Sequence, residues 1–256
     1  MGYKILGEPF EVSGEVLGNP TGRLPYSQRV LNTQPDSLIQ YLPFGEIIGS
    51  ANAIDLSPEG NDAGYNTVTL EVPGIGDGHT AARLNGAAGF IDIYSAALNA
   101  DFDGAEGTAL IWGRVDIGVW TDGIIRFMAQ LRVDGNNRLL IRKVNPNIIQ
   151  FIRTGGAVAE TLTLAGVSPI TYFMAACTWS ETDDEVRTYY MDDVNPFFEV
   201  GVATVLGAWA GNLVDAATVV GATNEAGGSV WDGDLAHWAV WNTPLTEEEL
   251  FALSIR

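Results

Sequence analysis

Short apolar runs alternate with clusters of turn-forming residues along most of the chain. Runs such as LIQYLPF, TVTLEV and RLLIRKV are separated by stretches such as SPEGNDAG, PGIGDGH and DGNN. Apolar runs of this length, bounded by Gly, Pro, Asn and Asp, are typical of β-strands joined by turns. About a dozen such strands predict an all-β fold, a two-sheet antiparallel jelly-roll sandwich, over residues 38–256.

The run LAHWAVW, residues 235–241, is apolar on both faces, which predicts a strand covered on both sides. Strict alternation places Leu235, His237 and Trp241 on one face and Trp238 on the other.

The segment TEEELFAL after that strand predicts a short C-terminal helix. Thr246 is a good N-cap, and Glu249 lies three residues later, where its side chain reaches back to the cap. The glutamates of this turn therefore have a structural role, and we do not expect them to act as an acid or base.

Residues 1–37 differ from the rest, because they hold four of the 11 prolines and five glycines. Proline removes a backbone donor and interrupts helices. The pattern predicts an extended N-terminal arm, with one short strand near residues 11–16, that docks on a partner. The apolar side chains available for docking include Ile5, Leu6, Phe10, Val12, Leu24 and Tyr26.

The formal net charge of −19 argues against binding of nucleic acid, which requires neutralisation of phosphates. Residues 123–153 nevertheless carry six cations and one acid, a local net charge of +5. These cations either lie on solvated strands and turns or form a basic patch that docks an acidic neighbour, including a second copy of the chain. The candidates for this patch are Arg126, Arg132, Arg138 and Arg142.

The lone cysteine, Cys177, lies in the apolar run YFMAACTW and is expected to be a buried free thiol. No apolar run approaches the roughly 18 residues of a membrane span, so we expect no insertion into a membrane. The first residues also lack the basic start and apolar core of a signal peptide.

Four segments follow one another in a recognisable order: LIQYLPFGEIIGSANAIDLSPEGNDAGY, HTAARLNGAAGFIDI, TYFMAACTWSETDDEVRTYYMDDV and GDLAHWAVWNTPLTEEELFAL. Together they resemble the laminin G-like, concanavalin A-like jelly-roll family over residues 38–256, and the arm lies outside the resemblance. Members of that family bind sugars, proteins or lipids, form parts of virions, or are attached to enzymes. The fold alone therefore does not fix the function.

The loop DLSPEGND offers Asp55, Asn61 and Asp62 as calcium ligands, because the resemblance places a cation loop there. The alternative is a turn held by hydrogen bonds from its own Asp and Asn side chains. The spacing does not fit an EF-hand loop, and Ala236 and His237 stand where some family members carry acids. We expect no resident cofactor, with calcium as the one open possibility.

Tryptophans could stack on sugar rings if they are exposed, although most of the seven lie in apolar strands and are expected in the core. Three follow or precede turn-rich loops and are the candidates for a glycan platform: Trp120, Trp209 and Trp231.

In ETDDE, Glu181, Asp183 and Glu185 alternate like the catalytic carboxylates of related jelly-roll glucanases. The resemblance, however, places this segment in a hairpin turn, and polar residues intervene where a strand over a core would be apolar. The sequence has neither a G-x-S-x-G elbow nor a cysteine cluster for a metal. We therefore expect a protein that is not an enzyme.

Together these observations predict a non-catalytic structural or recognition component of an assembly, most concretely a bacteriophage or virus particle. It would serve as a capsid decoration or tail-fibre protein, located in the virion, with other subunits or its own copies as partners. The alternative is a free carbohydrate-binding module that recognises a glycan. A third class is a jelly-roll glycoside hydrolase.

Overall fold

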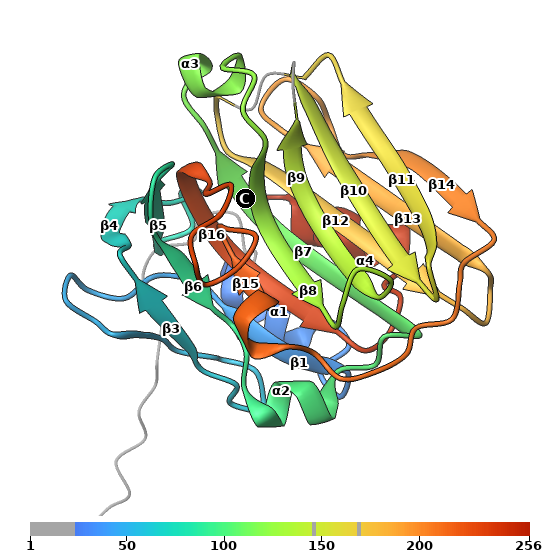
Figure 1. The fold of residues 1–256 in the computed structure, drawn as a ribbon. Helices are drawn as coiled ribbons and strands as arrows, with labels where there is room; N and C mark the ends of the chain where they lie inside the picture. Colours follow the sequence, from blue (N-terminus) through green and yellow to red (C-terminus); the bar gives the residue numbers. More distant parts are fainter. Residues whose placement is uncertain (1–23, 145–146, 168–169) are drawn as a thin grey trace, which may run out of the picture.

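The computed structural model describes residues 24–256 except 145–146 and 168–169, and the chain forms two antiparallel β-sheets packed face to face (Figure 1). In the first sheet the strands run in the order β14 (Phe198–Thr204), β13 (Glu185–Met191), β12 (Phe173–Ser180), β7 (Glu106–Arg114), β16 (Asp232–Trp241), β5 (Thr80–Asn85) and β4 (Thr69–Pro73), and β1 (Leu38–Leu42) also pairs with β16. In the second sheet the order is β11 (Val158–Ala165), β10 (Ile148–Gly155), β9 (Arg138–Val144), β8 (Arg126–Arg132), β15 (Val219–Val220), β6 (Phe90–Asp92), β3 (Ala63–Asn66) and β2 (Asn52–Ala53). The predicted all-β, two-sheet antiparallel sandwich is confirmed.

Short helices lie in the connections: α1 (Tyr26–Asn32), α2 (Ala96–Asp101), α3 (Ile117–Trp120), α4 (Glu247–Ser254) and the 3₁₀ turn η1 (Asp215–Ala217). Within the described part of the chain, none of the helices has the length and apolar character needed to cross a membrane.

The main core lies between the two sheets and takes one face of each strand. Trp179, Trp231 and Trp238 are among its largest side chains, and all three are buried. Cys177 belongs to the same core as a free thiol, as predicted, and burial raises its pKa to about 12. A thiol so far from ionisation is a packing residue rather than a reactive one.

A second apolar layer covers the outer face of the first sheet. Helices α1 and α4 pack there, and Figure 1 shows both behind the strands of that sheet. Leu250 and Leu253 of α4 are fully buried against Trp241, and the indole Nε1 of Trp112 donates to the hydroxyl of Tyr26 at 2.7 Å. The strands β8–β11 of the second sheet have no such helix over them among the described residues (Figure 1).

Helix α1 corrects the predicted extended arm for residues 26–32. Tyr26 and Val30 are four residues apart, so they share one helix face, and both are buried. The guanidinium group of Arg29 donates to the carbonyls of Ala252 and Ile255, which ties α1 to the end of α4. This helix is therefore part of the folded domain, because it gives an apolar face to the first sheet.

The residues predicted to dock on a partner fall into two groups: those that the structure describes and those that lie outside the described residues. Tyr26 faces the interior and is not available to a partner, so its assignment was wrong, whereas Leu24 is 54% exposed. Ile5, Leu6, Phe10, Val12 and the strand predicted near residues 11–16 lie outside the described residues. Docking by those residues stays a prediction.

Strand β16 is covered on both sides, as predicted, but its register is not the expected one. A bulge between Ala236 and Ala239 interrupts the pairing with β7, and His237 takes a φ of 50° there. Leu235 therefore faces the main core together with Trp238, while His237 and Trp241 face the outer layer. The predicted grouping of Leu235 with His237 was wrong because strict alternation does not survive a bulge.

The predicted capping box at the start of α4 is confirmed. The hydroxyl of Thr246 accepts from the amide of Glu249 at 3.2 Å, and the Glu249 carboxylate accepts from the amide of Thr246 at 2.8 Å. Glu249 thus satisfies a backbone donor that the helix itself cannot satisfy.

Candidate functional site

The outward side chains of β8, β9, β10 and β11 share one side of the second sheet, called here the β8–β11 face, and those in its middle row on β8–β10 are buried. In β9, Leu139 and Ile141 enter the main core, so Arg138, Leu140 and Arg142 point outward. Cross-strand pairing then arranges the face in three rows: Phe127–Arg142–Gln150–Thr163, Gln130–Leu140–Ile152–Thr161 and Arg132–Arg138–Thr154–Ala159.

Arginines of this face lack an acidic partner among the described residues, although the chain has 32 acids and only 13 lysines and arginines. Arg138 and Arg142 form no ion pair with any described carboxylate. Most other described cations are paired with acids: Arg83, Arg114, Arg126, Lys143, Arg153, Arg187 and Arg256.

Arg142 is held in place without being neutralised. Its Nε and Nη2 donate to the amide oxygen of Gln150 at 3.1 and 2.9 Å, and its guanidinium carbon lies 5.7 Å from the centre of the Phe127 ring. Burial, and after it the charge of Arg138, lowers the pKa of Arg142. The guanidinium group remains charged at neutral pH because its ordinary pKa is so high.

The third row, that of Arg138 and Thr154, contains two buried polar atoms without partners among the described residues. The hydroxyl of Thr154 is buried, with the residue only 3% exposed, and it makes no hydrogen bond to a described residue. Nε of Arg138, directly opposite on β9, is also buried and unpartnered. Buried polar groups are nearly always satisfied, so each exception requires an explanation.

A small apolar floor lies beneath these polar groups. Phe127, Leu140 and Ile152 are buried, and they form a cluster of their own, apart from the two large cores. Long side chains such as arginine cover apolar surface with their aliphatic stems while the charged ends reach water. The β8–β11 face thus combines an apolar floor with hydrogen-bonding groups above it.

The predicted basic patch is narrower than expected. Arg126 is buried and binds Asp122 at 2.7 Å and Asp232 at 3.5 Å, so its assignment to a docking surface was wrong. Arg132 donates to the backbone carbonyl of Asp134 at 3.1 Å. The pKa of the Asp134 side chain is lowered first by the hydrogen bond from the Asn136 amide, and the charge of Arg132 adds to that effect. Among the described residues, Arg132, Arg138 and Arg142 are the outward arginines of this face that form no ion pair, and Arg132 is engaged by the backbone carbonyl of Asp134.

The structure contradicts two of the three tryptophan candidates for a glycan platform. Trp120 and Trp231 are 2% and 0% exposed, so neither ring can stack on a sugar. Trp209 is half-buried: its ring contacts Phe102 and lies against Gly104, where a side chain would collide with the indole. A role for Trp209 in sugar binding stays a prediction.

The calcium candidates lie in a loop that is held by its own hydrogen bonds. The Asp55 carboxylate accepts from the amides of Tyr41, Ser57 and Asn61 and from the Ser57 hydroxyl, at 2.6–2.8 Å. Asp62 accepts from the amide of Asp55 at 2.8 Å. The Asn61 side chain is tied in the same way, with its amide nitrogen donating to the carbonyl of Ile39 at 2.9 Å and its oxygen accepting from the Ser95 hydroxyl at 2.9 Å.

These bonds match the turn alternative, because both oxygens of Asp55 are already engaged by donors of the protein. The loop therefore needs no cation to hold its shape.

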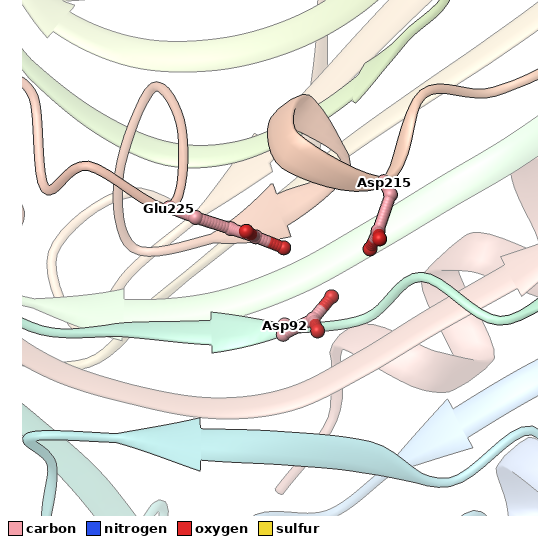
Figure 2. A group of neighbouring side chains, drawn as sticks. All are labelled: Asp92, Asp215 and Glu225. Carbon is pink, nitrogen blue, oxygen red and sulfur yellow. The ribbon is translucent and has the colours of Figure 1, made fainter.

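A different group of acids is close enough to hold a cation. Figure 2 shows Asp92 of β6, Asp215 of η1 and Glu225 of the following loop pointing toward one another, with carboxylate oxygens within 4.8 Å. Burial and then the negative charges of their neighbours raise the pKa of Asp92 and of Glu225. Oxygen ligands of this kind suit a hard divalent cation. Acidic groups are common on proteins without an ion, so proximity alone assigns no ligand here.

The segment ETDDE forms the turn between β12 and β13, as the resemblance implies. Glu181 accepts from Nη2 of Arg153 at 2.6 Å and from the amide of Trp209 at 2.5 Å. Glu185 instead binds Arg187 at 2.8 Å. The carboxylates are bound to different partners and do not line one strand, so the arrangement of a glucanase is not formed there.

Neither histidine lies in an open site. His237 is fully buried, with Nδ1 2.9 Å from the Tyr41 hydroxyl and Nε2 3.0 Å from a carboxylate oxygen of Asp77. Its ring also contacts those of Tyr26 and His79. It is a packing residue of the outer apolar layer.

Sequence reasoning missed Gln150, Thr154 and the three acids of Figure 2. The period of two along IIQFIRTG was sufficient to place Gln150 and Thr154 on the same face of a strand, but not to say that this face points outward. The acids come from three separate segments, and no local pattern connects them.

No protein-family model matches the sequence, and no curated protein matches it. Solved structures do show a similar fold. The binding domain of botulinum neurotoxin serotype D superposes with a TM-score of 0.62 at 11% identity, over 86% of this chain and 52% of that one. Trypanosoma rangeli sialidase superposes with a TM-score of 0.61 at 15% identity, over 85% of this chain and 32% of that one.

The CBM40 domain of Ruminococcus gnavus IT-sialidase, bound to α2,3-sialyllactose, superposes with a TM-score of 0.53 at 13% identity. That match covers 68% of this chain and 96% of the domain. This chain spans about half of the toxin domain and about a third of the Trypanosoma sialidase. The likeness supports the predicted concanavalin A-like jelly roll, whereas the finer assignment to laminin G-like domains stays a prediction.

Proposed function

We propose that the chain is a non-catalytic carbohydrate-recognition domain whose ligand binds the β8–β11 face. One observation carries the proposal. The outer face of the first sheet is covered by α1 and α4, whereas the β8–β11 face carries hydrogen-bonding groups over an apolar floor and has no described helix over it.

The chemistry of this face suits a sugar. Sugar hydroxyl groups donate and accept hydrogen bonds, and their ring faces are apolar. Gln150 offers an amide, and the exposed Thr161 and Thr163 offer hydroxyl groups that both donate and accept. Ligand sites generally combine an apolar lining with a few placed polar groups, and the face has this composition.

The fold agrees with this proposal without establishing it. The CBM40 domain, solved with a bound sialyllactose, shares the sandwich at low identity. Such a likeness supports the carbohydrate-binding alternative from the sequence better than it supports a virion part. A place in a virus particle stays a prediction that no feature of the described fold favours.

The proposal is tested on a glycan array with matched variants. Gln150→Leu keeps the side-chain size but removes the amide, so we expect it to weaken binding of any glycan hit about tenfold. Gln28→Leu is the control, because Gln28 is exposed on α1, behind the first sheet. Absence of any specific glycan, or equal loss in both variants, would overturn the proposal.

The non-catalytic part has its own test. Each array hit is incubated with the chain, and its chain length is followed by chromatography. We expect no cleavage. Hydrolysis that disappears with Glu225→Gln or Glu181→Gln would show that carboxylates of this chain are catalytic, and the protein would then be a glycoside hydrolase.

A further inference from the structure

We infer that the ligand of the β8–β11 face carries an anionic group, a carboxylate or a sulfate, which Arg138 and Arg142 bind. The inference rests on the proposed glycan function and specifies the chemical class of that glycan. It follows from three features of the face: its unpaired cations, the free donors of the two arginines on β9, and the unpartnered hydroxyl of Thr154.

The unpaired cations are the first feature. A protein with a formal net charge of −19 has many more acidic than basic side chains. Most of its other described cations form ion pairs with those acids. Arg138 and Arg142 are half-buried, yet no described carboxylate lies within ion-pair distance of either. A partly desolvated charge without a partner is unfavourable, and an incoming anion removes that cost.

The geometry of β9 is the second feature. Arg138 and Arg142 lie four residues apart on one strand, so their Cα atoms are about 13 Å apart with Leu140 between them. The donors on Nη1 of Arg142 make no hydrogen bond to a described residue, and neither does Nε of Arg138. A guanidinium group binds a carboxylate or sulfate through two parallel hydrogen bonds, and free donors are required for this.

Thr154 supplies the third feature. Its hydroxyl is buried beside Arg138, and it has no partner among the described residues. A hydroxyl can donate to an anion at the same point as the arginine. A buried polar group without a partner in the free protein is explained if a bound ligand supplies the missing hydrogen bond. Thr154 lies at the edge of the proposed site, where a ligand can do so.

An anionic sugar explains these features better than a neutral sugar or an acidic protein. A neutral sugar would leave both guanidinium charges unpaired. A large acidic protein would be repelled by the net charge of the chain, whereas a short anionic glycan contacts little beyond the face.

The first arm of the test compares probes that differ only in charge. Oligomers of galacturonic acid are titrated against the same oligomers as methyl esters, and dextran sulfate is titrated against dextran. We expect an acidic probe to bind at least about tenfold more tightly than its neutral counterpart, and we expect that preference to shrink as salt is added. The two pairs distinguish a carboxylate from a sulfate.

The second arm uses variants of the full chain. Arg138→Gln and Arg142→Gln should each weaken the acidic probe about tenfold or more. Arg138→Gln should also leave a neutral probe unaffected, whereas Arg142 additionally holds the amide of Gln150. Arg187→Gln is the control for charge, because Arg187 lies on the first sheet and binds Glu185 and Glu199. Circular dichroism establishes that each variant is folded.

The third arm works without any glycan. Inorganic sulfate is titrated into ¹⁵N-labelled protein, and the Nε–Hε signals of the arginines are followed. We expect the signals of Arg138 and Arg142 to shift, while that of Arg187 stays in place. The titration is repeated with acetate, and failure of both sulfate and acetate to move these signals would overturn the inference, whether or not a glycan binds.

The outcomes separate the two proposals. Neutral glycans that bind in a Gln150-dependent manner, with no effect of the arginine variants, would leave the glycan function intact and overturn the anion inference. If sulfate shifts the Nε–Hε signals of both arginines but no glycan binds, the result would support an anion site and overturn the glycan function. Tight binding of an acidic peptide of poly-glutamate in preference to both acidic glycans would assign the site to a protein partner instead.

Discussion

Arg138 of β9 and Thr154 of β10 are cross-strand neighbours on the β8–β11 face, and each keeps a buried polar atom that has no hydrogen-bond partner among the described residues. Such atoms cost stability when they stay unsatisfied. Both atoms lie on the face proposed to bind ligand, and under that proposal a bound ligand satisfies them.

Thr154→Val tests directly whether the unsatisfied hydroxyl lowers stability and contributes to binding. Valine keeps the shape and the β-branch but removes the unsatisfied hydroxyl, so we expect the variant to gain about 1 kcal/mol in stability. In a chain of this length that gain raises Tm by roughly 2–4 °C. Affinity for the acidic probe should fall several-fold in the same variant. A loss of stability in thermal melts would mean that the hydroxyl already has a partner in the free protein.

The loop around Asp55 should be independent of calcium. Asp55→Ala removes the acceptor for three amides and a hydroxyl, so we expect it to cost roughly 3 kcal/mol. Addition of EDTA to the wild-type protein should leave Tm unchanged. If EDTA lowers Tm in the wild type but not in Asp55→Ala, the loop holds a metal ion and the hydrogen-bonded account is incorrect.

Stability should depend on pH through His237. Burial lowers the pKa of His237 below its ordinary value of 6.5, even though the neighbouring Asp77 opposes that shift. The unfolded chain therefore binds a proton near pH 6.5 that the folded chain does not, so this contribution is complete above pH 6.5 and is lost as the pH falls below it. Thermal melts between pH 8 and about pH 5 should show Tm decreasing toward acid.

The other groups that face His237 define the control for that experiment. They are Tyr26, Arg29, Tyr41, Asp77 and His79. Burial opposes ionisation of Asp77, but bonds and charges from both histidines outweigh it and hold its pKa below 3.8, outside the tested range. The substitution His237→Asn suits the backbone, because asparagine tolerates a φ of 50°. The variant should be less stable than the wild type, and its Tm should change less with pH. An unchanged slope in this variant would assign the pH dependence to other groups.

The cap of α4 makes a smaller contribution. Thr246→Ala should cost about 1 kcal/mol, because the amide of Glu249 loses its acceptor. Glycan binding should be unaffected, since α4 covers the opposite sheet. Loss of binding at unchanged Tm would place the ligand near α4 and contradict the assignment to β8–β11.

The strands could be predicted because short apolar runs are bounded by turn-forming residues, and RLLIRKV after the turn DGNN is a clear example. Its pattern places Arg138 and Arg142 on one side of a strand, where the structure has them. The pattern does not say that Thr154 lies opposite Arg138, because that depends on the register between two strands. Register is set by turn geometry and by packing of the whole sheet.

Burial of the tryptophans was harder to predict. Trp231 follows a glycine-rich loop, which is typical of an exposed position, yet its ring is fully buried at the start of β16. The cause is tertiary: the loop folds back and delivers the ring into the space between the sheets. The bulge at His237 is likewise invisible in an alternating pattern, and it reverses the face of Leu235.

The most direct test of the account is to locate the ligand. Backbone ¹H–¹⁵N signals of the full chain are followed while galacturonic acid oligomers are added. The account predicts that the signals that shift belong to residues 138–144, 148–155 and 158–165, while those of residues 247–254 stay in place. Shifts confined to residues 247–254 or to the loop at residues 55–62, with none in β9–β11, would contradict it.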